Sequence, residues 1–163
     1  MDGTDGSRDL LGLTASIAGD FLGSLDSRPV FPDTSVDELR AALGGSLPEG
    51  PTDPDQVVQE LADAADPGLV GIPGGRYFGF VIGGAVPAAL AADWLTSAWD
   101  QNAGLYVGGP AASVVEEVAG AWLAELLGLP ADVSFGFVTG CQMAHVTALA
   151  PRASTSSTAS AGT

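Results

Sequence analysis

Apolar residues recur at intervals of three and four along much of the chain, which is the spacing of one helix face. Near the start they predict a helix over residues 10–25 with an apolar face of Leu10, Leu13, Ile17, Phe21 and Leu25. Glycines in this segment weaken an isolated helix by about 1 kcal/mol each, so we expect it to need a partner surface. The same spacing predicts a helix over residues 111–127 with a core-facing stripe of Val114, Val118, Trp122 and Leu126.

Other helices are marked by start and stop signals. Ser35, followed three residues later by Glu38, forms a capping box, and Asp53 before Pro54 combines an N-cap with proline at the first helical position. Gly128 lies where a glycine commonly ends a helix. These signals and the remaining apolar runs predict further helices over residues 36–43, 54–65, 87–99 and 141–150.

A different pattern lies between the last two predicted helices. Residues 133–138 are mostly apolar and rich in β-branched and aromatic types, which predicts a short strand, and Gly140 marks a tight turn after it. Helix, strand, turn and helix in this order open an α/β layer, so we expect the α/β fold class. The glycine-rich residues 67–84 are expected to form a loop with a short extended piece.

Charge and composition narrow the possible functions. The 163 residues contain 5 basic and 20 acidic side chains, a formal net charge of −15, which disfavours nucleic acid and anionic membranes as partners. Only 15% of residues are charged, so we expect part of the surface to be covered by another molecule. The longest apolar run is shorter than the roughly 20 residues of a membrane span, and no signal peptide is recognisable. The single cysteine fits a cytoplasmic location.

Several short strings occur together in a fixed order along the chain. They are RPVFP (28–32), LP (47–48), YFGFV (77–81), PAALAADWL (87–95), QN (101–102), EEV (116–118), WL (122–123) and GFVTG (136–140). Over residues 10–150 the sequence thereby resembles the N-terminal portion of the pyridoxal-phosphate (PLP)-dependent group II amino-acid decarboxylases, which include the aromatic-amino-acid and glutamate decarboxylases. The resemblance implies decarboxylation of an amino acid, a small-molecule substrate, by a PLP enzyme.

The resemblance also implies a fold and a division of the chain. Residues 1–109 would form an N-terminal helical arm that packs against the partner subunit of a homodimer and includes a pocket-lining segment. Residues 110–150 would begin the large α/β domain of fold type I PLP enzymes, which would here be truncated. Residues 151–163 contain no large apolar side chain, so we expect a disordered tail.

Two groups of candidate site residues follow from the resemblance. Gly140, Cys141 and Gln142 lie where the family holds the cofactor phosphate, although the family often has serine or threonine there. A strand-to-helix turn is also an anion site in geometry and dipole, while the simpler alternative is an ordinary connecting turn. The substrate-pocket segment of the family matches Phe78, Phe80, Ile82 and Gly83.

No residue of the chain is assigned a catalytic role. PLP chemistry requires a lysine that holds the cofactor as a Schiff base, and this sequence contains no lysine, so covalent attachment is impossible here and the chain alone is expected to be inactive. His145 does not match the family's ring-stacking histidine and is expected to be a packing or surface residue. Cys141 and His145 are one helical turn apart, but two ligands are too few for a metal site, and we expect none.

Alternatives remain open for the origin and the role of the chain. The tail, read in another frame with GC-rich codons, resembles the family's continuation, so we interpret it as the product of a frameshift; a natural stop is the alternative. The chain could instead be a non-catalytic dimerisation or interaction module that uses residues 10–25, or one half of a split enzyme. An acidic helical binding protein unrelated to the family is a third possibility.

Overall fold

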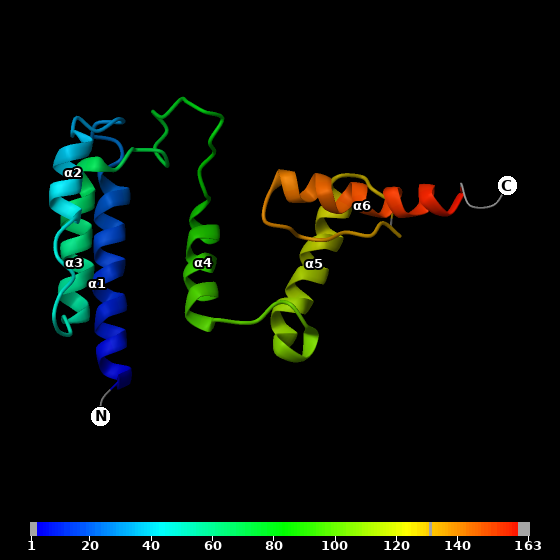
Figure 1. The fold of residues 1–163 in the computed structure, drawn as a ribbon, viewed down its shortest axis with the longest axis horizontal. Helices are drawn as coiled ribbons and strands as arrows, with labels where there is room; N and C mark the ends of the chain where they lie inside the picture. Colours follow the sequence, from blue (N-terminus) through cyan, green and yellow to red (C-terminus); the bar gives the residue numbers. More distant parts are fainter. Residues whose placement is uncertain (1–2, 131, 160–163) are drawn as a thin grey trace. The chain divides into compact units, whose positions relative to one another are not determined.

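The computed structural model describes the backbone of residues 3–130 and 132–159, and the side chains of residues 6–130 and 132–150. The chain divides into two compact units, Met1–Ala91 and Ala92–Thr163. Figure 1 shows that regular structure in the described residues is helical. No helix among these residues is long and apolar enough to cross a membrane.

The first unit is built on three helices that pack together. They are α1 (Gly3–Ser24), α2 (Val36–Leu43) and α3 (Pro54–Ala65), followed by a short 3-10 turn at Asp66–Gly68. Helix α3 contacts both α1 and α2 (Figure 1). The predicted face of α1 is half-buried at Leu13, Ile17 and Phe21, and the helix begins earlier than residue 10.

The predicted caps of α2 and α3 are confirmed. The Ser35 hydroxyl accepts the backbone N–H of Glu38, and the Glu38 carboxylate accepts the backbone N–H of Ser35 at 2.7 Å. Asp53 accepts from the first free amides of α3, and Pro54 is its first residue. These reciprocal bonds satisfy donors that have no acceptor within the helix.

The loop between α3 and α4 (Pro87–Trp99) is hydrogen-bonded to the segment that follows α1. The Gly71 N–H donates to the Val30 carbonyl at 2.8 Å, and the Arg76 guanidinium donates to the carbonyls of Leu25 and Arg28 at 2.8 and 2.5 Å. Farther along, Phe80 and Val81 have φ of 52° and 55°, a left-handed conformation that bulky side chains rarely adopt. The predicted loop is confirmed, and it contains a turn at these two residues.

The second unit contains α5 (Pro110–Leu126) and α6 (Cys141–Ala159). Gly128 ends α5 with φ of 65°, and its N–H donates to Glu125 while the N–H of Leu129 donates to Ala124. This pair of bonds is the Schellman arrangement, in which a glycine satisfies the last helical carbonyls. Helix α6 continues to Ala159, into the segment for which the sequence predicts disorder, and residues 160–163 lie outside the described part.

The predicted strand over residues 133–138 is wrong for this chain. Its backbone is extended but belongs to no ladder, and the described residues contain no strand. A strand needs a neighbour to pair its N–H and C=O groups, and no other described segment supplies one. The α/β class predicted from this segment is therefore not reproduced.

The described residues also contain no buried hydrophobic side chain. The predicted core stripe of α5 is exposed instead, with Trp122 at 65%. Among the residues whose side chains are described, only Gly71, Gly109 and Gly120 are buried. The apolar stripe predicted on α5 thus exists as a helix face but lacks a covering partner within the described chain, whereas the face of α1 is partly covered.

Candidate functional site

The turn before α6 is the predicted phosphate site, and its geometry begins with Gly140. This residue has φ of +150°, a conformation that favours glycine, and Cys141 follows as the first residue of the helix. The first intrahelical bond here runs from the Ala144 N–H to the Gly140 carbonyl at 2.9 Å. The backbone N–H groups of Cys141, Gln142 and Met143 therefore have no helical carbonyl one turn back to which they can donate. They form the positive end of the helix dipole.

The side chains around this turn are exposed and uncharged or weakly basic. Cys141 carries a free thiol whose Sγ lies 3.8 Å from Nε2 of His145, one turn along α6. His145 is exposed, which confirms the surface alternative predicted for it. Among the described residues no group of three or more histidine, cysteine, aspartate or glutamate side chains could hold a metal ion.

The residues of this turn suit the phosphate end of PLP but not its aldehyde end. The unpaired amides of the α6 N-terminus and the Gln142 side chain are donors suited to a phosphate. A Cβ added at Gly140 would meet nothing within 4 Å, so the turn is open on that side. The aldehyde end of the cofactor would have no partner here, because the sequence contains no lysine.

The predicted substrate-pocket residues lie at an exposed loop tip of the first unit. Phe78 is 92% exposed, and Phe80 occupies the left-handed turn next to Ile82. Neither of the two cavities described below is lined by these residues or by Gly83. The loop belongs to the first unit and the Gly140–Gln142 turn to the second, and each is described by itself.

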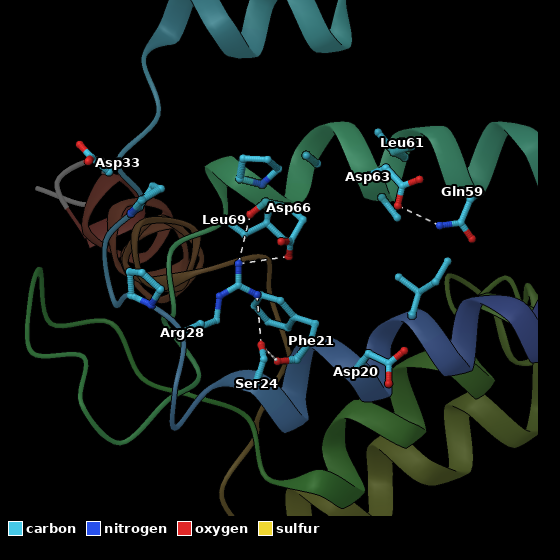
Figure 2. Close-up of a pocket in the computed structure, with 16 residues that line it drawn as sticks. Asp20, Phe21, Ser24, Arg28, Asp33, Gln59, Leu61, Asp63, Asp66 and Leu69 are labelled. Carbon is cyan, nitrogen blue, oxygen red and sulfur yellow. Dashed lines mark hydrogen bonds and ion pairs between the residues drawn. The ribbon is translucent and has the colours of Figure 1, made fainter.

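A groove in the first unit was not predicted from the sequence. Figure 2 shows it between α1, the segment that follows α1 (residues 25–33), and α3. Its cavity volume is about 650 Å³. Its lining includes the apolar side chains of Ile17, Phe21 and Leu69 and the carboxylates of Asp20 and Asp33.

Among the described residues that line this groove, Arg28 is the only basic one, and its guanidinium already has hydrogen-bond and ion-pair partners. Its guanidinium donates to the Asp66 carboxylate and carbonyl, both at 3.1 Å, and to the Ser24 hydroxyl at 3.3 Å (Figure 2). The Phe21 ring lies under it, with 4.6 Å between the guanidinium carbon and the ring centroid. A groove that is lined by carboxylates, and whose one arginine already pairs with Asp66, does not suit an anionic ligand. We therefore assign Arg28 a structural role.

The second cavity, of about 210 Å³, lies within the second unit. It is bounded by the C-terminal half of α5 and by residues 133–137, and its walls are mostly apolar. Gly120 is at one side of this cleft, and Phe135 and Phe137 pack edge to face with ring centroids 6.2 Å apart. The cleft is therefore the packing surface on which the extended segment lies.

Comparison with curated proteins finds relatives among amino-acid decarboxylases. The aromatic-L-amino-acid decarboxylase of Bacillus atrophaeus is 29% identical over 130 residues, covering 80% of this chain and 27% of the relative. Tryptophan decarboxylase 1 of Oryza sativa subsp. japonica is 29% identical over 126 residues, covering 77% and 24%. No family model matches the chain.

Comparison with solved structures also finds similarity to a decarboxylase. The structure of Oryza sativa TDC with PLP matches with a TM-score of 0.73 and 27% identity, covering 85% of this chain and 29% of that one. The structure of Oryza sativa TDC with PLP and tryptamine matches with a TM-score of 0.71 and 29% identity, covering 79% and 26%. The resemblance to group II PLP decarboxylases is thereby confirmed, and the chain spans about a quarter of the length of the curated relatives it matches.

Proposed function

We propose that this chain forms the N-terminal part of a PLP-dependent decarboxylase that acts on an aromatic amino acid. The observation that carries the proposal is the shared fold, over most of the chain, with a PLP-bound enzyme from Oryza sativa. The lysine that PLP chemistry requires would come from polypeptide that this sequence does not contain. The chain by itself would therefore help to bind and orient the cofactor and the substrate, but it would not turn over substrate.

In this proposal the turn before α6 holds the cofactor phosphate. The backbone amides of Cys141 and Gln142 donate to the phosphate oxygens, and Gly140 leaves the approach open. The Gln142 side-chain amide supplies the further donor that a hydroxyl supplies in many relatives. Bound PLP would contribute an electron-withdrawing ring that stabilises the charge left at Cα as CO₂ departs.

The loop around Phe80 would supply part of the wall that receives the substrate side chain. Phe78, Phe80 and Ile82 are apolar and exposed, and Gly83 leaves space for a ring to approach. The left-handed conformations of Phe80 and Val81 cost on the order of 1–3 kcal/mol each and persist only where surrounding structure fixes them. We infer that a second surface completes this pocket in the assembled enzyme.

The phosphate proposal is tested by comparing PLP with pyridoxal, which lacks the phosphate. Dissociation constants can be measured from ³¹P line broadening for PLP and from tryptophan fluorescence for both ligands. We expect the chain to bind PLP at least tenfold more tightly than pyridoxal, and Gly140→Val to remove the difference by blocking the turn. Gly6→Ala, at an open position in α1, is the matched control and should retain it. Equal binding of the two ligands would refute the phosphate site.

A second measurement tests whether the chain alone is inactive as a decarboxylase. The purified chain, incubated with PLP and either tryptophan, tyrosine or dihydroxyphenylalanine, should release no CO₂ above the rate of free PLP. Release above that rate would contradict the proposal that the reactive lysine lies elsewhere.

A second candidate function is a non-catalytic dimerisation or interaction module, or one half of a split enzyme. It is favoured by the lack of any buried hydrophobic side chain in the described residues, and by exposed leucines on α1 such as Leu11 and Leu22. Sedimentation of the chain at several concentrations tests whether it forms a homodimer. Self-association that Leu11→Glu weakens and Ser16→Glu does not would support dimerisation through α1, whereas a monomer at all concentrations would contradict it.

A further inference from the structure

The extended segment that leads into the Gly140 turn is held mainly by side chains. At its start the Val133 N–H donates to the Pro130 carbonyl at 3.1 Å, and the next backbone bond described is that of Ala144 to Gly140. Between these two points no backbone hydrogen bond is described for residues 134–139. The path of the segment therefore depends on what its side chains pack against.

The main anchor is Phe135, whose ring lies directly on Gly120 of α5. Gly120 is buried, and a Cβ built on it would overlap three carbons of the Phe135 ring. Gly120 does not have a positive φ, so the backbone conformation does not require glycine there. A glycine inside a helix costs about 1 kcal/mol relative to alanine, and here the space for Phe135 is the feature that offsets this cost.

We propose that Gly120 is a positioning residue for the cofactor-phosphate turn. By admitting the Phe135 ring, Gly120 fixes the extended segment on α5, and the segment in turn sets where Gly140, Cys141 and Gln142 point their amides. This inference rests on the proposed phosphate site for its functional consequence, but the packing relationship between Gly120 and Phe135 is independent of it.

The packing of Phe135 on Gly120 predicts that alanine at position 120 is unfavourable, whereas helix propensity alone predicts that it is favourable. Gly120→Ala places a methyl group where the ring lies, so Phe135 must leave the cleft even though alanine favours the α5 helix. Ala121→Ser is the matched control, because it also adds one heavy atom and lies at the next, exposed position of α5.

The structural test uses NMR on the full chain. In the wild type we expect nuclear Overhauser contacts from the Phe135 ring to Gly120, Leu123 and Ala124. In Gly120→Ala these contacts should disappear and the amide resonances of Gly140, Cys141 and Gln142 should shift, while Ala121→Ser retains both. Retention of the ring contacts in Gly120→Ala, or unshifted resonances after their loss, would overturn the proposal.

Phe135→Ala gives a second route to the same answer. It removes the ring without touching α5, so it should shift the same three amide resonances. The double variant Gly120→Ala/Phe135→Ala should resemble Phe135→Ala, because the added methyl group then meets no ring. Additive shifts in the double variant would show that the two residues act separately and would contradict the proposal.

The functional test measures ligand affinity. Gly120→Ala should weaken PLP binding about tenfold, with little change for pyridoxal, and the double variant should match Phe135→Ala. If the wild-type chain binds the two ligands equally, the phosphate site fails, and the NMR comparison still decides whether Gly120 positions the turn. If the wild type prefers PLP and Gly120→Ala keeps the full preference, the positioning role fails alone.

Discussion

Arg28 stacks on the ring of Phe21 while it also forms an ion pair with Asp66, 38 residues farther along the chain. A single side chain thereby joins the last turns of α1 to the end of α3. The Arg28 side chain is only 14% exposed, whereas that of Asp66 is 61% exposed. The two partners should therefore contribute unequally to the stability of the first unit.

We expect Arg28→Ala to lower the free energy of unfolding of the first unit by about 1–3 kcal/mol, because it removes several hydrogen bonds and the ring contact together. Asp66→Asn should lower it by less than about 1 kcal/mol, because an exposed ion pair is screened by water. Arg28→Lys keeps the charge but loses the planar fork, so it should lie nearer to Arg28→Ala. Urea titration followed by circular dichroism measures all three, and equal effects of Arg28→Ala and Asp66→Asn would contradict the assignment.

The capping box of α2 gives a pH-dependent prediction. The backbone N–H of Ser35, and then its hydroxyl, donate to the Glu38 carboxylate and hold the pKa of Glu38 below its ordinary value of 4.5. The stabilisation is complete above that ordinary value and is lost as the pH falls through the lowered pKa of the folded state. Side-chain NMR titration should show a difference between the pKa of Glu38 and this ordinary value, with Glu38 protonating at the lower pH. In Ser35→Ala the difference should shrink, and an unchanged Glu38 titration would contradict the capping account.

Two glycine substitutions should have opposite signs. Gly128→Ala places a Cβ in a left-handed residue at the end of α5 and should destabilise the second unit by about 1–2 kcal/mol. Gly12→Ala lies inside α1, where an added Cβ meets nothing within 4 Å, and should stabilise α1 by about 1 kcal/mol. Thermal unfolding by circular dichroism compares them, and destabilisation by both would show that α1 needs Gly12 for close packing.

The exposed thiol of Cys141 offers a direct probe of the proposed phosphate turn. It should react with a disulfide reagent in the absence of denaturant, because it lies on the surface at the start of α6. PLP should slow this reaction, while the same concentration of pyridoxal should have little effect. Identical rates with and without PLP would mean that the cofactor does not occupy the turn.

The helices were predictable where their signals are local. The caps at Ser35, Asp53 and Gly128 act within four residues of themselves, so the sequence contains all of the necessary chemistry. The Gly140 turn was predictable for the same reason. Its proposed role as a phosphate site rests on the resemblance. The comparisons support that resemblance at the level of the family and do not test the site.

The errors concern features that depend on distant partners. The strand over residues 133–138 has the right composition, but a strand exists only beside another strand, and composition cannot supply one. The stripe containing Trp122 has helical spacing, but spacing does not say whether a covering surface is present. The Arg28 groove was missed because the contact with Asp66 spans 38 residues and leaves no local pattern.

The unpaired extended segment has a consequence for handling the protein. Residues 133–138 read Val-Ser-Phe-Gly-Phe-Val, with no charge and no proline, and their backbone donors and acceptors find no ladder in the described chain. Such short, uncharged segments of high β-propensity are templates for cross-β stacking between molecules. We therefore expect this hexapeptide, which a complete sheet would protect, to promote fibril growth of the chain at high concentration, and a charged residue in place of Ser134 to suppress it, as thioflavin T fluorescence would measure.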